Sequence, residues 1–139
     1  MKWWYYLLQF TWGILINLFG AIAYLILAIC FGFPSHKYRN MYCVAIPWNF
    51  GGLNLGVFAI YGKDCPQVLS HEYGHSIQNL WWGPFTLLVI ALPSAIRYWY
   101  REIKTSLNKP LRTAYDDIWF EGQATALGKK ADADTWTWL

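Results

Sequence analysis

Two long apolar stretches run along the chain and predict membrane helices. The first, Trp12–Phe33, contains one strongly polar residue, Asn17, and its length is sufficient to cross a hydrocarbon core of about 30 Å. The second, Trp81–Tyr100, is interrupted by Pro93, which should kink the helix because proline removes one backbone hydrogen bond. We therefore expect a transmembrane helix over residues 12–33 and a second membrane helix over residues 84–103.

An amphipathic pattern before the second stretch predicts another helix, over residues 66–82. Pro66 suits the first helical position, and Gly83-Pro84 should end the helix. One face carries apolar residues at helical spacing, namely Val68, Leu69, Tyr73, Ile77 and Leu80. The opposite face gathers polar residues, namely Gln67, His71, His75, Gln78 and Asn79. A polar strip inside so apolar a protein needs partners, such as a metal ion and hydrogen bonds to its ligands.

The remaining elements are a short β-hairpin and a C-terminal helix. Met41–Ile46 and Leu53–Tyr61 are rich in β-formers and flank a turn that contains proline and glycine, which predicts a hairpin over residues 41–61. An amphipathic helix is expected over residues 114–128. The fold class is thus a mainly α membrane protein. No repeat or linker divides the chain, so residues 1–139 should form a single membrane-embedded domain.

Composition and charge agree with a membrane location. Hydrophobic residues make up 56% of the chain and charged residues only 14%, whereas about a quarter of a soluble domain is charged. A cleaved signal peptide is the alternative for the first stretch, but the apolar run is too long and no small-x-small cleavage site follows it. Basic residues cluster after each apolar stretch, which places the C-terminus in the cytoplasm. They account for the net charge of +3, and no basic surface remains for nucleic acid.

His71-Glu72-Tyr73-Gly74-His75 is the most informative motif, because it fits the pattern H-E-x-x-H. Residues four apart share one face of a helix, so His71 and His75 can bind one metal ion, for which Zn²⁺ is the expected cofactor. Glu72 then lies beside the metal, where its carboxylate can take a proton from water. The alternative is a pair of helix histidines satisfied by hydrogen bonds, with a solvated Glu72.

A zinc peptidase needs a third protein ligand, and Glu121 is the residue that we favour. It lies between Phe120 and a run of small residues, in the predicted C-terminal helix. Asp117, one turn earlier, is either an alternative ligand or a hydrogen-bond partner of a ligand. Asp116 and Asp117 can instead simply charge the start of the helix. A fourth ligand from Cys65 or Asp117 would indicate a closed, structural site.

The cysteines are less informative. Cys43 and Cys65 flank the predicted hairpin and could form a disulfide if that side were extracellular. The predicted topology places them in the cytoplasm, where reduced thiols are expected.

The segments HEYGHSIQ and, further on, WFEGQATALG together resemble the gluzincin arrangement of zinc metallopeptidases. More closely, HEYGH, WWGPF, LPSAIRYWYRE and FEGQA are similar to small bacterial integral-membrane proteins regarded as metallopeptidases, over roughly Pro47 to Gly128. The resemblance implies that His71, His75 and Glu121 are the ligands and that Glu72 is the general base. Site-2 proteases also carry HExxH on a membrane helix, but this chain lacks their downstream Asn-Pro or Leu-Asp-Gly element.

We therefore expect a membrane-bound, zinc-dependent endopeptidase that hydrolyses peptide bonds near the membrane surface, in a bacterial cytoplasmic membrane. Its partners would be the lipid bilayer, a protein or peptide substrate, and membrane partner proteins or further copies of the chain. Tyr73 and Tyr115 are candidates for the donor that stabilises the transition state. The alternative function is a non-catalytic metal-binding membrane subunit or adaptor.

Overall fold

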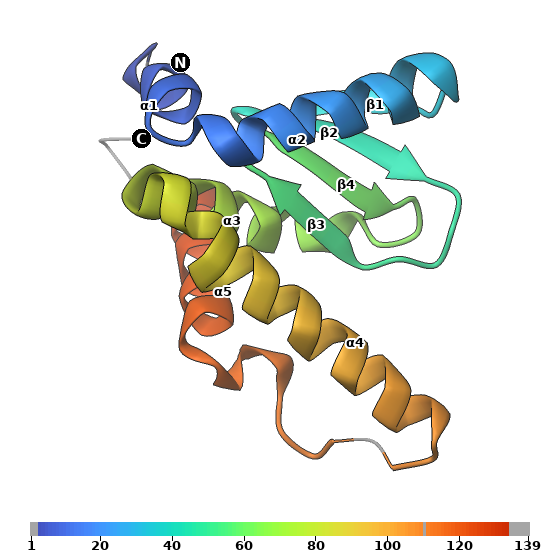
Figure 1. Cartoon of the computed structure of the whole chain (residues 1–139). Coiled ribbons are helices and arrows are strands. Elements are labelled where there is room, and N and C mark those ends of the chain that lie inside the picture. Colours follow the sequence, from blue (N-terminus) through green and yellow to red (C-terminus); the bar gives the residue numbers. More distant parts are fainter. Residues whose placement is uncertain (1–2, 110, 134–139) are drawn as a thin grey trace.

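A computed structural model describes residues 3–109 and 111–133, and in it a small sheet lies between layers of helices (Figure 1). The first half contains α1 (Trp3–Thr11), α2 (Ile14–Tyr24), the π-helix η1 (Leu25–Cys30), β1 (Ser35–Tyr38), β2 (Met41–Ile46), β3 (Gly52–Leu55) and β4 (Phe58–Gly62). The second half contains η2 (Pro66–Val68), α3 (Leu69–Trp82), η3 (Gly83–Phe85), the π-helix η4 (Leu87–Ala91), α4 (Leu92–Ser106), η5 (Tyr115–Asp117) and α5 (Trp119–Asp132). The expected mainly α class is confirmed.

The sheet has the strand order β1-β2-β4-β3, and its pairing differs from the predicted hairpin. β2 pairs in parallel with β4, while β3, which lies between them in sequence, forms an antiparallel hairpin with β4 at the sheet edge. The two-residue turn of this hairpin contains Gly56, whose φ of +77° favours glycine. β1 was not predicted and pairs antiparallel with β2. The prediction of one hairpin over residues 41–61 was therefore wrong.

Both faces of the sheet are buried. Successive side chains of a strand point to opposite faces, so neighbouring residues of one strand belong to different clusters. Val44, Ile46 and Ile60 pack with side chains of α2 and η1. On the other face, Cys43, Ala59 and Tyr61 are buried in one cluster with residues of α3 and α5. α2 and α3 thus lie on opposite sides of the sheet (Figure 1). The motif is on α3.

The first apolar stretch is helical over Ile14–Cys30, formed by α2 and η1, which is shorter than the predicted helix over residues 12–33. The axis bends by 97° between Trp3–Thr11 and Ile14–Cys30. Asn17 stabilises this bend, because its amide group donates to the backbone carbonyls of Gln9 and Gly13 at 2.8 Å, and its Oδ1 accepts from the Val57 N–H at 2.7 Å. The one polar residue of the stretch therefore joins the helical bend to the sheet.

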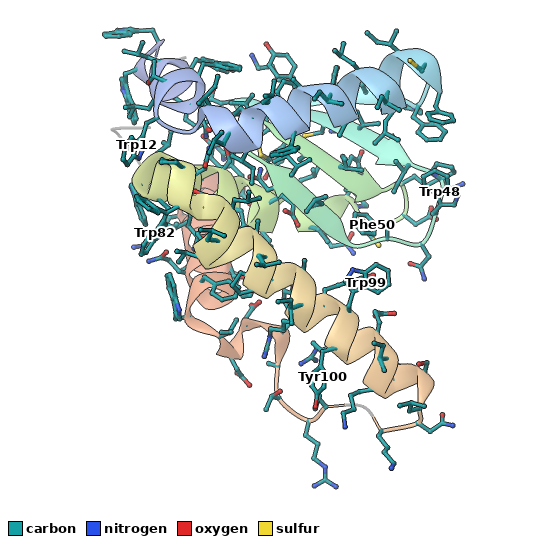
Figure 2. The ribbon with its side chains drawn as sticks, in the orientation of Figure 1. Trp12, Trp48, Phe50, Trp82, Trp99 and Tyr100 are labelled. Carbon is teal, nitrogen blue, oxygen red and sulfur yellow. The ribbon has the colours of Figure 1, made fainter. Side chains whose placement is uncertain are left out.

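Within residues 3–109 and 111–133, no single helix combines the length and the apolar character needed to cross a membrane. Two strongly bent helix pairs are long and apolar enough to cross a membrane when their two helices are taken together. One is Trp3–Thr11 with Ile14–Cys30, and the other is Pro66–Phe85 with Leu87–Ser106. The second pair bends by 115° near Thr86 rather than at Pro93, which follows the π-helix η4 in the first turn of α4. α4 buries none of its residues, and Trp99 and Tyr100 project from it (Figure 2).

α3 and α5 pack closely against each other, and two glycines make the approach possible. A Cβ atom on Gly74 would overlap the backbone of Ala124, and one on Gly128 would overlap the backbone carbonyl of Ser70. Backbone atoms cannot swing aside as side chains do, so any larger residue must push the helices apart. This contact brings the first turn of α5 against the motif on α3.

We predict that Gly128→Ala destabilises the protein by about 1–3 kcal/mol, because the added methyl group meets a backbone carbonyl. Gly51→Ala is the matched control, since nothing lies within 4 Å of the position that its methyl group would take and its φ is not positive. Thermal unfolding of both variants under the same conditions measures the difference. Equal melting temperatures would contradict the proposed close contact.

Candidate metal site

Three side chains from two helices direct their metal-binding atoms at one point. His71 and His75 come from α3 and Glu121 from the first turn of α5. The two Nε2 atoms lie 3.0 Å apart, and Oε2 of Glu121 lies 3.0 Å from one and 3.1 Å from the other. Donor atoms of a tetrahedral zinc site are about 3.3 Å apart, so these three atoms are nearly spaced to hold one ion.

The outer nitrogen of His71 is held by a chain of hydrogen bonds. Its Nδ1 lies 2.8 Å from Oγ1 of Thr125, and that hydroxyl donates its only proton to Oδ2 of Asp116 at 3.0 Å. The threonine oxygen must therefore accept from His71, which places the imidazole proton on Nδ1. Nε2 of His71 is then a bare lone pair that points at the site.

His75 is oriented in the same way by Gln78. Its Nδ1 lies 2.8 Å from Oε1 of Gln78. The amide group of Gln78 donates to the Phe120 carbonyl at 2.8 Å and to Oε1 of Gln123 at 2.9 Å, so the oxygen must face the histidine. Nδ1 of His75 carries the proton, and Nε2 is a second lone pair. Of the two partners considered from the sequence, Gln78 holds the ligand, whereas Asn79 donates to Gln9.

These contacts test whether the residues fit a metal ion. Two imidazole lone pairs and a carboxylate oxygen face one another at about hydrogen-bond distance with no proton assigned between them. Such an arrangement repels unless a positive charge occupies its centre. One shared proton would satisfy one contact, whereas a divalent cation satisfies all three acceptors together. The donor set of two histidines and one glutamate suits Zn²⁺.

Glu121 is fully buried, yet its surroundings favour the charged form. Its second oxygen, Oε1, accepts a hydrogen bond of 2.5 Å from the hydroxyl of Ser94, a residue of α4. Burial alone would raise its pKa, but the hydrogen bond from Ser94, together with those from His71 and His75 when a proton occupies their Nε2 atoms, outweighs burial and holds the pKa of Glu121 below its ordinary value. The carboxylate is therefore ionised at neutral pH, as a metal ligand must be.

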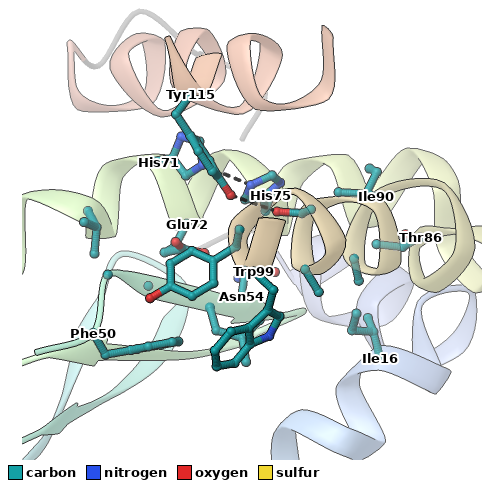
Figure 3. A pocket seen from close by; sticks show the side chains of 18 residues that line it. Ile16, Phe50, Asn54, His71, Glu72, His75, Thr86, Ile90, Trp99 and Tyr115 are labelled. Carbon is teal, nitrogen blue, oxygen red and sulfur yellow. Dashed lines mark hydrogen bonds between the residues drawn. The ribbon is translucent and has the colours of Figure 1, made fainter. Parts of the chain in front are cut away.

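Glu72 lies beside this group and is held against the edge strand β3. Its buried carboxylate accepts a hydrogen bond from the Asn54 backbone N–H. Gly52 leaves room for it, since a Cβ atom there would overlap the carboxylate. Glu72, His71 and His75 all line one cavity of about 480 Å³ (Figure 3). The position of Glu72 at the cavity wall suits a residue that acts on water or substrate rather than on the ion.

The structure separates the residues that the sequence left open. Asp117 stays outside the site, because its Oδ2 accepts from the Ala114 backbone N–H; Asp116 instead makes the indirect contact through Thr125. Tyr73 is buried in the core, whereas Tyr115 lines the cavity. In the described part of the chain, His71, His75 and Glu121 are the one group of such side chains able to hold a metal, and Cys65 is not part of it.

Ser94 and Thr125 were not predicted from the sequence. Neither lies in the motif, and hydroxyl side chains occur throughout the chain, so nothing in the sequence distinguishes these two. Only the tertiary structure, in which α5 packs against α3 and α4 approaches α5, brings them to the ligands.

Comparisons with known proteins give no further guide, because no family model, no curated protein and no solved structure matches this chain. The chemistry of the site must therefore be judged from its geometry.

We predict that Thr125→Val lowers zinc affinity by about 10–100-fold, because the Nδ1 proton of His71 loses its acceptor while the side-chain shape is kept. Thr105→Val, on the exposed side of α4, is the control and should bind zinc as the unmodified protein does. Competition of each purified protein with a chelator measures the affinity. Unchanged affinity in Thr125→Val would show that this hydrogen bond does not support a ligand.

Proposed function

We propose that this protein is a membrane-bound, zinc-dependent endopeptidase. The observation that carries the proposal is the convergence of the two Nε2 lone pairs and the Glu121 carboxylate at one end of a cavity, with Glu72 on the adjoining wall. An ion held by these three residues would have three protein ligands, and His71 and His75 line the cavity from which water could supply a fourth. An open position is typical of catalytic zinc sites, whereas structural sites are closed by a fourth protein ligand.

Zn²⁺ held by His71, His75 and Glu121 would polarise the scissile carbonyl and acidify a water molecule in the cavity. Glu72 would accept a proton from that water and later deliver it to the nitrogen of the leaving amine. The Asn54 N–H holds the carboxylate on the cavity wall. Ser94 fixes the third ligand through its hydrogen bond to Oε1 of Glu121.

Tyr115 is the best placed donor for the oxygen that becomes negative in the transition state. Its hydroxyl lies 3.1 Å from Oγ of Ser94, and because Ser94 donates its proton to Glu121, Tyr115 must donate to Ser94. Burial raises the pKa of Tyr115 to about 12, so the phenol keeps its proton at neutral pH. A hydrogen bond to the substrate oxygen would replace the bond to Ser94.

The edge strand β3 offers a place for an extended peptide. It pairs with β4 on one side, and the Asn54 N–H shows that its outer edge faces Glu72. Alternate residues of a strand direct their backbone groups to opposite sides, so Gly52 shares this outer edge. A peptide that adds to this edge as a further strand would pass directly beside the general base.

The chain has three glutamates, and their Gln variants should behave in three different ways. Glu72→Gln keeps zinc but loses peptide hydrolysis, because the amide cannot accept a proton. Glu121→Gln weakens zinc binding and activity together, because a neutral amide replaces a charged ligand. Glu102→Gln, exposed on α4, should change neither. Metal content and peptide cleavage should be measured in parallel on the same preparations.

Two results would contradict this assignment. Full activity in Glu72→Gln would show that Glu72 is not the general base. Full zinc occupancy in Glu121→Gln would show that Glu121 is not the third ligand. A protein that binds zinc through these residues but hydrolyses no peptide would instead support a non-catalytic, metal-binding membrane subunit.

The membrane location is part of the proposal and is supported by the exterior of the helices. Large apolar side chains are exposed along α1, α2, η1, η4 and α4, among them Leu7, Phe10, Leu15, Leu18, Phe19, Ile22, Ile26, Leu88, Leu92, Ile96 and Ile103. Exposed apolar surfaces of this extent mark a contact with lipid or with a membrane partner, such as a second copy of the chain. Figure 2 shows side chains of this kind on the outer sides of α2 and α4.

We predict that a reporter fused after Leu139 reports a cytoplasmic C-terminus in bacterial cells, because basic residues cluster after the second apolar stretch. Arg97, Arg101 and Lys104 lie on α4, and both arginines donate to backbone carbonyls of the loop that follows. Paired fusions to a reporter active only in the cytoplasm and to one active only outside measure the side. An external C-terminus would overturn the topology and would restore the expectation of a disulfide between Cys43 and Cys65.

A further inference from the structure

The cavity at the metal site has two different walls. On one side lie β3 and the loop before it, including Phe50 and Leu53, and on the other lie η4 and α4, including Ile90, Ala95 and Trp99 (Figure 3). His71, Glu72 and His75 contribute the chemically active part of its lining. A substrate must therefore lie between the edge of the sheet and the helical segment formed by η4 and α4, on which Leu88 and Leu92 are exposed.

The lining excludes charged substrate side chains. Apart from His71, Glu72 and His75, none of the described residues that line the cavity is Asp, Glu, Lys or Arg. A charged side chain placed there would lose its water without gaining a partner, which is strongly unfavourable. A volume of about 480 Å³ accommodates several apolar side chains of a peptide. Uncharged, mainly apolar residues on both sides of the scissile bond fit this cavity best.

The mouth of the cavity is continuous with the apolar exterior. Trp99 lines the cavity and is also 64% exposed, and Leu53 on the opposite wall is 39% exposed. Leu88 and Leu92 are exposed on the same helical segment as Trp99. A segment embedded in lipid could therefore reach the metal site along apolar surface, without passing through a polar surface.

The edge strand requires the bound segment to be extended. A helix that spans a membrane satisfies its backbone hydrogen bonds internally, so it cannot also pair with β3. A segment can pair with β3 only where its helix ends or is broken. This requirement distinguishes a peptide from an apolar lipid chain, which has no backbone groups to offer a strand.

We infer that the substrate is the apolar, unwound end of a membrane span in another protein, which enters the site from the lipid side between β3 and α4. This inference rests on the proposed peptidase function and adds the class of substrate. The apolar walls favour apolar side chains in the substrate, and the edge of β3 favours an extended substrate backbone. Glu72 lies beside both.

The test compares two synthetic substrates that share one transmembrane anchor, so that both have the same concentration in the bilayer. In one, the segment beyond the anchor contains Leu, Val, Phe and Ala; in the other it contains Ser, Asn, Lys and Glu. The zinc-loaded full chain and each substrate are reconstituted in phosphatidylethanolamine–phosphatidylglycerol vesicles. We expect cleavage of the apolar segment to be at least about tenfold faster, and to be lost in Glu72→Gln.

The outcomes separate the two proposals. Equal or faster cleavage of the polar segment, dependent on Glu72, would overturn the substrate class and leave the peptidase function standing. Cleavage of neither substrate by the zinc-loaded protein, or cleavage that persists in Glu72→Gln, would overturn the peptidase function and this inference with it.

Two neighbouring residues of α4 provide a matched pair of variants. Ala95 lines the cavity, whereas Ile96 lies outside its lining and is 62% exposed. Ala95→Trp should fill the cavity and weaken binding of the apolar segment by about tenfold, with zinc content unchanged; Ile96→Trp should bind as before. Binding is measured by fluorescence anisotropy with Glu72→Gln as the background, so that no cleavage is needed. Equal binding by both variants would overturn the proposed route along α4.

Discussion

The contact between α3 and α5 is the constraint on which the candidate site depends. The three ligand atoms come from helices whose contributing residues are 46–50 positions apart in sequence, and they converge only because Gly74 and Gly128 let the backbones approach closely. Small residues at a helix crossing give close packing but little apolar burial of their own. The crossing is therefore supported by the shared apolar cluster of Tyr73, Ile77 and Leu127 beneath the sheet. The contact between α3 and α5 therefore determines both the packing of this core and the positions of the three ligand atoms.

The ligands belong to a larger polar cluster that fixes their protonation. Gln78 and Thr125 each hold the outer nitrogen of one histidine, and Ser94 holds the second oxygen of Glu121. The result is a concentration of lone pairs around a fully buried carboxylate, which is unfavourable without a cation. An ion bound there would therefore couple metal binding to folding, since it would stabilise the helix crossing that assembles the site.

The distribution of apolar and polar side chains is the reverse of that in a typical small soluble domain. Apolar side chains cover the outer sides of α2 and α4, whereas amide side chains are buried between α1, α2 and α3. Gln9 contacts Ser76, Asn17 and Asn79 within this buried cluster, so the N-terminal bend is joined to the motif helix by hydrogen bonds. Directional hydrogen bonds can hold helices together where lipid removes the hydrophobic driving force. A site between such helices and a sheet edge could be reached from the lipid and could also form backbone hydrogen bonds with a peptide.

The motif helix shows what the sequence alone determines. Its limits depend on local chemistry, namely a proline that suits the first turn and the Gly83-Pro84 pair that ends it, and residues 66–82 are helical. The common face of His71 and His75 follows from helical geometry in the same way. Glu121 was favoured for its position between Phe120 and a run of small residues, but the sequence left Asp117 open as an alternative ligand.

Tertiary structure decided the features that depend on residues distant in sequence. The bend near Gly13 is tied to Asn17 and the sheet, and the parallel pairing of β2 with β4 places β3 at the edge. The selection of Asp116 over Asp117 depends on where the hydroxyl of Thr125 lies. Local patterns describe which face of an element a residue occupies, but not which element packs against that face. Only packing brings a hydroxyl, an amide or a second helix to a given atom, so the hydrogen-bond partners and the cavity could not be read from the chain.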